Sequence, residues 1–124
     1  MAELLDTSVL IEIFGGNKKI LEQLSKYNST FELPSIVVFE LYCGTLKEKE
    51  EVMLEMMPKV PFDDESAKIA GKIFRDMKKK GKLPPTKDLL IAATAIARNA
   101  TLFTCDKGFE RFTEYGLKVE ILEK

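Results

Sequence analysis

The chain opens with the stretch Leu4-Leu5-Asp6-Thr7-Ser8-Val9-Leu10-Ile11, in which a short apolar strand passes through an aspartate into a helix. A second stretch, Leu102-Phe103-Thr104-Cys105-Asp106, ends another apolar strand on an aspartate. Between these two stretches, short apolar runs alternate with segments of helical periodicity. This alternation predicts an α/β fold with a mainly parallel sheet that is covered by helices on both faces.

The expected strands are short apolar runs, namely Glu3–Thr7, Thr30–Leu33, Val60–Phe62, Thr101–Thr104 and Leu117–Leu122. The expected helices lie between and after them, over Ser8–Phe14, from the Asn17 cap through Leu24, Pro34–Leu46 with a charged continuation over Lys47–Met57, Asp63–Lys80, Asp88–Asn99 and Asp106–Tyr115. We predict a three-layer α/β/α sandwich with about five strands, formed by residues 1–124 as a single domain.

Composition excludes several classes of protein. With 45% hydrophobic residues, the chain can bury a core without disulfides. Two cysteines, Cys43 and Cys105, are too few for a disulfide framework or a four-cysteine zinc site, and we expect both thiols to be packed. The N-terminal segment lacks the pattern of a signal peptide, and no apolar run is long enough to span a bilayer. We therefore expect a soluble, cytoplasmic protein.

The absence of histidine constrains the chemistry more than any residue that is present. It excludes an imidazole base, histidine-ligated metals and every Ser/His or Cys/His nucleophile pair. The 19 basic and 20 acidic residues give a net charge of −1, so bulk charge cannot drive binding to nucleic acid. Such binding would need a local basic patch or a bound cation.

Four acidic residues stand at positions that suggest a site. Asp6 and Asp106 end the first and fourth strands, and the carboxyl ends of parallel strands form the functional edge of such sheets. Asp88 begins the helix before the fourth strand, and Glu40 interrupts an apolar helix. Alternatively, each aspartate caps a helix and Glu40 lies on a solvated stripe. Carboxylates that converge repel one another, and a divalent cation would offset that repulsion.

The chain resembles PIN-domain ribonucleases, in particular the toxin half of prokaryotic VapBC toxin–antitoxin pairs. The blocks that carry the resemblance stand in family order at residues 5–11, Val38-Phe39-Glu40-Leu41-Tyr42-Cys43-Gly44, Asp88-Leu89-Leu90-Ile91-Ala92-Ala93-Thr94-Ala95 and Thr104-Cys105-Asp106-Lys107-Gly108-Phe109. The resemblance implies a homodimer, an antitoxin partner and an acidic site for Mg²⁺ or Mn²⁺. It implies that this site is formed by Asp6, Glu40, Asp88 and Asp106, flanked by Ser8 and Thr104.

The chain departs from the family pattern at two positions. Lys87 stands where many relatives have an acidic or polar residue, and Gly108 stands where an aspartate is common. Neither departure removes one of the four acids, but both bear on the geometry of the site and on substrate preference.

These observations predict a metal-dependent endoribonuclease that hydrolyses RNA phosphodiesters, the family implying 5′-phosphate and 3′-hydroxyl products. Contacts to RNA could come from a basic run that leads to Asp88, or that run could be a solvated helix end matching the helix dipole. Its members are Lys72, Arg75, Lys78, Lys79, Lys80 and Lys82. Arg98 and Arg111 are further candidates, and Glu12 could reach the site from the first helix.

Two alternatives stay open. A PIN-like module that binds RNA or protein without cleavage would be marked by loss of an acid, and none of the four is lost. A nuclease of RNA maturation would often carry an extra module such as a zinc ribbon, which this sequence lacks.

Overall fold

The computed structural model describes residues 3–124 and contains one sheet of five parallel strands in the order β3-β2-β1-β4-β5. The strands are β1 (Glu3–Leu5), β2 (Phe31–Pro34), β3 (Lys59–Val60), β4 (Thr101–Thr104) and β5 (Lys118–Ile121). Leu4 of the central strand pairs with Glu32 of β2 on one side and with Leu102 of β4 on the other. The predicted α/β class and parallel sheet are confirmed.

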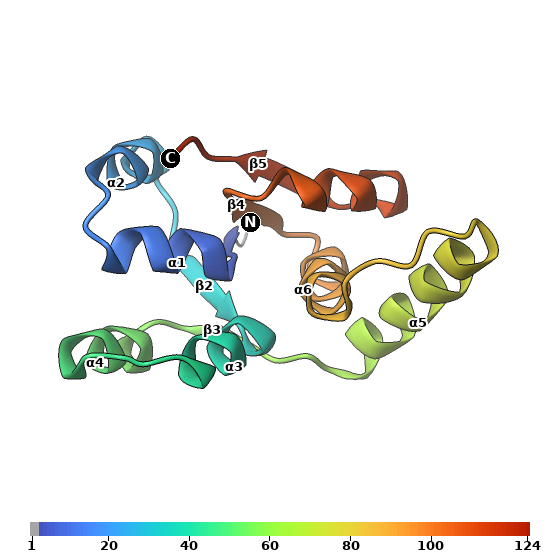
Figure 1. The fold of residues 1–124 in the computed structure, drawn as a ribbon, viewed down its shortest axis with the longest axis horizontal. Coiled ribbons are helices and arrows are strands. Elements are labelled where there is room, and N and C mark those ends of the chain that lie inside the picture. The colour runs from blue at the N-terminus through green and yellow to red at the C-terminus, as the bar shows by residue number, and fades with distance from the viewer. Residues whose placement is uncertain (1–2) are drawn as a thin grey trace.

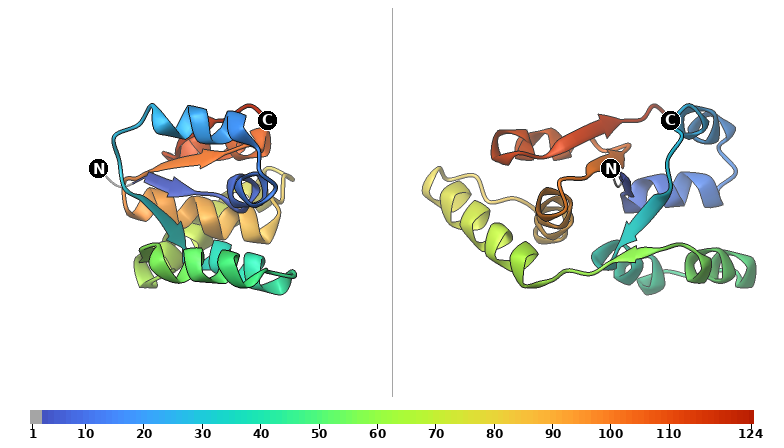
Figure 2. Two further views of the ribbon diagram at one scale, coloured as in Figure 1. Left: turned by 90° about the vertical axis from the view of Figure 1, so that its left-hand side faces the viewer. Right: turned by 180° about the vertical axis from the view of Figure 1, so that it is seen from behind.

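The helices in the described residues are α1 (Thr7–Phe14), α2 (Lys18–Ser25), α3 (Ser35–Cys43), α4 (Glu48–Met56), α5 (Asp64–Lys79), α6 (Thr86–Ala97) and the 3-10 helix η1 (Lys107–Tyr115). α1 and α2 lie on one side of the sheet, and α6 lies on the other with α5 packed on its outer side (Figure 1). α3 and α4 lie beside the β3 edge, as the views from the side and from behind also show (Figure 2). The three-layer prediction is therefore confirmed.

The core holds the central strands rigidly. Leu4 and Leu5 of β1 and Phe103 of β4 are buried, and the Phe103 ring meets those of Tyr27 and Phe31 edge-on at centroid distances of 4.7 and 5.3 Å. Burial of each such apolar side chain contributes about 1.5–3 kcal/mol. Residues that immediately follow β1 and β4 are thus fixed in position. None of the helices within residues 3–124 has the length and apolarity required to cross a bilayer.

Two expected helices differ from the structure. The continuous helical segment over residues 34–57 is wrong: α3 ends at Cys43, Gly44 takes an extended backbone, and α4 begins after Lys47. The Glu50 carboxylate accepts the backbone N–H of Lys47 at 2.9 Å, which satisfies one of the amides at the start of α4. The expected helix over residues 106–115 is a 3-10 helix, which ends at Gly116 with a φ of 101°.

The two thiols differ from each other. Cys105 is partly buried, whereas Cys43 is exposed at the end of α3, so the expectation that both are packed is wrong for Cys43. The α3 stripe that packs inward runs through Val37 and Leu41, which turns Cys43 toward solvent.

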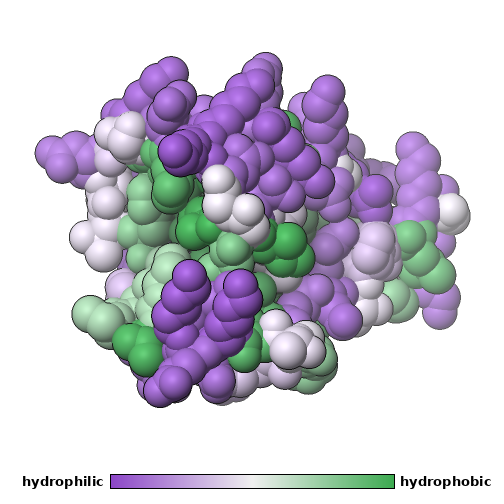
Figure 3. Space-filling view, turned by 60° about the vertical axis from the view of Figure 1, so that its left-hand side comes forward, coloured by the Kyte–Doolittle hydropathy of each residue, from purple (hydrophilic) through white to green (hydrophobic). Residues whose placement is uncertain are grey.

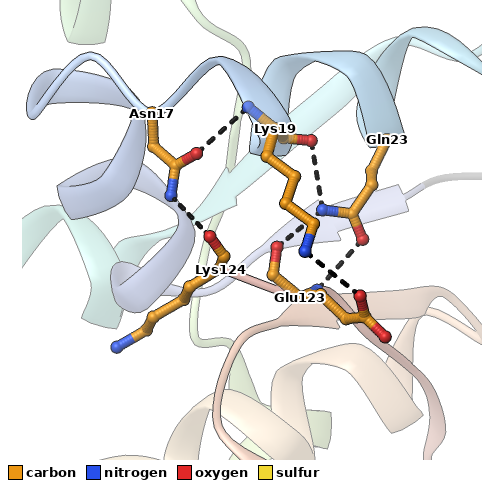
Figure 4. Close-up of polar contacts among 5 residues, drawn as sticks. All are labelled: Asn17, Lys19, Gln23, Glu123 and Lys124. Carbon is orange, nitrogen blue, oxygen red and sulfur yellow. Dashed lines mark hydrogen bonds and ion pairs between the residues drawn. The ribbon is translucent and has the colours of Figure 1, made fainter.

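The C-terminal residues are held by polar side chains of the α2 region (Figure 4). Gln23 donates to the carbonyl of Glu123 at 2.7 Å and accepts its N–H at 3.0 Å, as a neighbouring strand would. Asn17 donates to the Lys124 carbonyl at 3.3 Å, and Lys19 pairs with the Glu123 carboxylate at 3.3 Å. These contacts fasten the end of β5 to the α1–α2 side of the sheet.

Candidate active site

Asp6 is the most deeply buried carboxylate of the predicted site, with 4% of its surface exposed. Its backbone N–H donates to the Phe103 carbonyl at 2.9 Å, which joins the end of β1 to β4. Its Oδ2 accepts hydrogen bonds from Ser8 Oγ and from Thr104 Oγ1, both at 2.7 Å. The carboxylate makes no capping bond to α1, so the alternative role as a helix cap is wrong for Asp6.

The two hydroxyls connect Asp6 to the segment that follows β4. Ser8 Oγ accepts the backbone N–H of Cys105, and Thr104 Oγ1 accepts the backbone N–H of Asp106, both at 3.0 Å. Because each hydroxyl has a single proton and donates it to Asp6, the 3.3 Å approach of the two hydroxyl oxygens is a contact and not a further hydrogen bond. Both of these hydrogen bonds end on Oδ2. The other carboxylate oxygen, Oδ1, therefore stays available to another ligand.

Asp106 and Asp88 occupy different positions relative to their helices. Asp106 is exposed, and its Oδ1 accepts the backbone N–H of Gly108 at 2.8 Å as the N-cap of η1. The capping alternative is therefore confirmed for Asp106. Asp88 is the third residue of α6, whose N-cap position is taken by Pro85, so Asp88 is no cap. It is partly buried at the N-terminal end of that helix.

Glu40 is partly buried in α3 and is held by a residue of the first helix. The hydroxyl of Thr7 donates to Glu40 Oε1 at 2.7 Å. The alternative reading of Glu40 as a solvated residue is therefore wrong. Sequence reasoning missed Thr7, although its position directly after Asp6 was a signal, since a residue at the start of α1 must lie beside the end of β1.

Asp88 experiences the charges of the other three acids. Burial raises its pKa most, and the carboxylates of Asp6, Asp106 and Glu40 raise it further, to about 6. Arg111 acts in the opposite direction. A carboxyl group whose pKa is raised by like charges marks a place where negative charge is concentrated. Perturbed carboxyls of this kind occur at functional sites more often than elsewhere.

The donor set fits a hard divalent cation. It consists of carboxylate oxygens, and the charge repulsion recorded at Asp88 is what a cation would offset. Within residues 3–124, no three acidic or thiol side chains are gathered closely enough to enclose an ion as they stand. Magnesium is usually bound by one or two carboxylates, with waters and substrate phosphates as the remaining ligands, so a site for it does not require three enclosing carboxylates.

The other candidates from the sequence have varied environments. Glu12 accepts a hydrogen bond from Asn17 Nδ2 at 2.9 Å and is not among the groups that act most strongly on the pKa of Asp88. Lys80 of the basic run pairs with Asp76 at 3.1 Å and with Glu114 at 3.2 Å.

The two departures from the family pattern have local structural correlates. The ammonium group of Lys87 lies 5.8 Å from the centre of the Phe39 ring, a cation–π contact between α6 and α3. A Cβ atom at Gly108 would lie 3.0 Å from Asp106 Oδ1 and 3.3 Å from Arg111 Nη2. Position 108 therefore leaves little room for an aspartate while Arg111 and Asp106 keep their places.

The chain is similar in sequence to proteins of a known family. The PIN domain family matches residues 4–115. Ribonuclease VapC3 of Methanocaldococcus jannaschii is 57% identical over 93 residues, which cover 75% of this chain and 97% of the relative. Ribonuclease VapC1 of the same organism is 39% identical over 121 residues, covering 94% of this chain and 85% of the relative.

Solved structures give the same result. A chain in the crystal structure of VapBC2 from Rickettsia felis, bound to a DNA fragment from its promoter, superposes with a TM-score of 0.81 at 26% identity. The match covers 99% of this chain and 100% of that one. The chain therefore belongs to the PIN-domain family, among the VapC ribonucleases.

Proposed function

We propose that this protein is a metal-dependent endoribonuclease that hydrolyses RNA phosphodiesters as the toxin of a toxin–antitoxin pair. The observation that carries the proposal is the concentration of negative charge at Asp88, whose pKa is raised by Asp6, Asp106 and Glu40. Such a cluster repels a phosphodiester, and a bound cation would offset that repulsion. Its RNA substrate would place the protein in the cytoplasm.

In this proposal, Asp6, Glu40, Asp88 and Asp106 hold Mg²⁺ or Mn²⁺, either directly or through water. The ion would supply Lewis acidity toward the phosphodiester and the attacking water. Ser8 and Thr104 fix the orientation of the Asp6 carboxylate through their bonds to Oδ2. Groups that orient a ligand in this way typically affect metal affinity or activity 10–100-fold, as an order of magnitude.

The test is cleavage of a labelled single-stranded RNA by the purified protein with Mg²⁺, with Mn²⁺ and with EDTA. We expect cleavage that requires the metal and is lost in the Asp6→Asn variant. Asp64→Asn is the matched control, because Asp64 is an exposed aspartate in the first turn of α5 and is not among the groups that act most strongly on the pKa of Asp88. Mn²⁺ binding is measured on the same samples by calorimetry.

The outcomes separate the parts of the proposal. Metal binding by folded protein without cleavage of a broad RNA pool would favour the non-catalytic binding module. Cleavage that persists in EDTA, or in Asp6→Asn, would contradict the metal site as assigned.

We place the antitoxin in a groove next to Glu40. The groove has a volume of about 450 Å³, and its walls include Thr7, Ile11, Phe14 and Leu41. A hydrophobic area with hydrophilic surroundings is visible on the side of the molecule that carries α1 (Figure 3). An apolar antitoxin segment bound here would cover the acidic site. Ile11→Asp should abolish binding of a VapB-like antitoxin in calorimetry and leave RNA cleavage unchanged.

We also propose a homodimer formed through α3 and α4. Phe39 and Tyr42 of α3 and Val52 and Met56 of α4 are exposed, Met56 by 80%. Large apolar side chains gathered on neighbouring helices are typical of interaction surfaces. Sedimentation should give a dimer for the unmodified protein and a monomer for Met56→Glu.

A further inference from the structure

A small cavity lies next to the acidic site, between the end of α5, the loop before α6 and η1. It has a volume of about 270 Å³ and is lined by Met77, Lys82, Leu83, Pro84 and Arg111. Its walls are apolar apart from two cationic side chains, and Leu83 is 60% exposed. A cavity with cationic and apolar walls suits a ligand that combines a negative charge with an apolar surface.

The two cationic side chains of this cavity, Lys82 and Arg111, are available to a ligand. Among the residues that the structure describes, neither Lys82 nor Arg111 makes an ion pair. Lys80, only two residues before Lys82, is bound by Asp76 and Glu114 and also lies 5.5 Å from the Tyr115 ring centre. Within the basic run, Lys80 therefore has a structural role, whereas the charge of Lys82 is available to a ligand.

Arg111 lines the cavity and also lies near Asp106 of the acidic site. The guanidinium group and the Asp106 carboxylate flank the same point, since a Cβ at Gly108 would lie 3.3 Å from one and 3.0 Å from the other. Arg111 also lowers the pKa of Asp88. A strand whose scissile phosphate lay at the carboxylates would thus bring a neighbouring nucleotide to Arg111.

We infer that Lys82 and Arg111 form a subsite that binds the RNA phosphate next to the scissile one, with the attached base against the exposed side chain of Leu83. The subsite rests on the proposed ribonuclease function and adds to it a positioning role for these residues. A planar guanidinium binds phosphate oxygens in pairs, and an ammonium adds a point charge. The apolar wall offers a surface to any base, so the subsite fixes the strand without reading its sequence.

The salt dependence of RNA binding tests the inference. The probe is a fluorescent 12-nucleotide single-stranded RNA of mixed sequence, titrated in EDTA at several salt concentrations. Each lost phosphate contact lowers the slope of log K against log salt by about 0.7 for single strands. Because both side chains bind the same phosphate, the Lys82→Gln/Arg111→Gln double variant should lower the magnitude of the slope by about 0.7. Leu83→Ala should raise the Kd and leave the slope unchanged.

The matched control is Arg98→Gln/Lys118→Gln, which removes the same two residue types. Arg98 is a candidate RNA contact in the sequence, but in the structure it follows the opposite end of α6 from Asp88, and Lys118 begins β5 away from the carboxyl edge of the sheet. Both are exposed. Unfolding by urea is measured for every variant, so that a loss of fold is recognised directly.

The results have clear readings. A slope that falls in Lys82→Gln/Arg111→Gln and not in the control supports the subsite. An equal fall in both, an unchanged slope, or unmodified protein that fails to bind at low salt would overturn it. RNA recovered after each titration is examined on a gel, because cut RNA in EDTA would mean failure of the metal-dependent function and not of the subsite.

Discussion

The Thr104 hydroxyl donates to Asp6 Oδ2 at 2.7 Å and accepts the backbone N–H of Asp106 at 3.0 Å. One side chain thus links the acids that follow two neighbouring strands, β1 and β4. Thr104 itself is fully buried, so its hydroxyl has no water to replace either partner. The relative position of two predicted metal ligands therefore depends on a group that binds no metal itself.

Thr104→Val should separate this positioning effect from simple packing. Valine keeps the shape and removes the hydroxyl, which leaves the Asp106 amide without its acceptor and Asp6 with Ser8 alone. We expect a loss of about 1–3 kcal/mol in the free energy of unfolding. We also expect RNA cleavage to fall roughly 10–100-fold. Urea unfolding and initial cleavage rates are the measurements.

Thr94→Val is the control for that substitution. Thr94 is equally buried, and its hydroxyl donates to the Leu90 carbonyl within α6 at 2.8 Å. Since that carbonyl already serves the helix, losing the hydroxyl should change stability by no more than about 0.5 kcal/mol. Equal losses of activity in both variants would argue that Thr104 only supports the fold.

The sequence allowed the sheet and the edge that carries the site to be predicted, because both follow from the order of elements. Once short apolar strands alternate with helices, a parallel sheet follows, and residues after its strands must share an edge. That reasoning placed Asp6 and Asp106 at one edge without any side-chain geometry.

Side-chain partners could not be predicted, because distant residues decide them. Asp6 and Asp106 both begin helical segments, yet only Asp106 caps its helix. The Asp6 carboxylate instead accepts a hydrogen bond from Thr104, which is 98 positions away in the sequence. Thr7 was missed for the same reason, since its partner Glu40 comes from another helix. The break between α3 and α4 depends on the local backbone of Gly44, where the apolar periodicity carries no signal.

Asp88→Asn should stabilise the metal-free protein at neutral pH. The folded-state pKa of Asp88, about 6, lies above its usual 3.8, so the folded protein binds this proton more tightly than the unfolded chain. In the unmodified protein, the stabilisation of the folded state by protonation of Asp88 is fully present below about pH 3.8 and is lost as the pH rises through about 6. The shift corresponds to at most about 3 kcal/mol, and solvent screening of this partly exposed group reduces it to about 1 kcal/mol.

The measurement for Asp88→Asn is urea unfolding in EDTA at pH 4 and pH 7.5. The free energy of unfolding should be higher for the variant than for the unmodified protein at pH 7.5. At pH 4 the two values should converge. Addition of Mg²⁺ should then stabilise the unmodified protein more than the variant, since a ligand stabilises only the state that binds it. A variant less stable than the unmodified protein at pH 7.5 would show that Asp88 is not under charge repulsion.

Protons should compete with the metal at the same carboxylate. Because a ligand carboxyl must be ionised, the apparent Kd for Mn²⁺ should rise about tenfold for each pH unit below the pKa of Asp88. That pKa is about 6, so affinity should be nearly constant above pH 7 and fall steeply toward pH 5. Calorimetric titrations of folded protein at four pH values test this. A Kd that does not change between pH 5 and pH 7 would remove Asp88 from the metal site.

Gly108→Ala should impair cleavage while the fold is kept. The new Cβ would lie 3.0 Å from Asp106 Oδ1 and 3.3 Å from Arg111 Nη2, so one or both side chains must shift by a few tenths of an ångström. Displacement of a predicted ligand by this amount should slow cleavage roughly tenfold.

Gly71→Ala in α5 is the control, since no atom lies within 4 Å of its added Cβ and alanine in a helix adds about 0.5–1 kcal/mol of stability. The measurements are initial cleavage rates and urea unfolding. Gly108→Ala should cleave RNA more slowly with unchanged stability, and Gly71→Ala should be more stable with an unchanged cleavage rate. Full activity in Gly108→Ala would mean that Asp106 and Arg111 tolerate displacement, and that neither is held in a position on which the reaction depends.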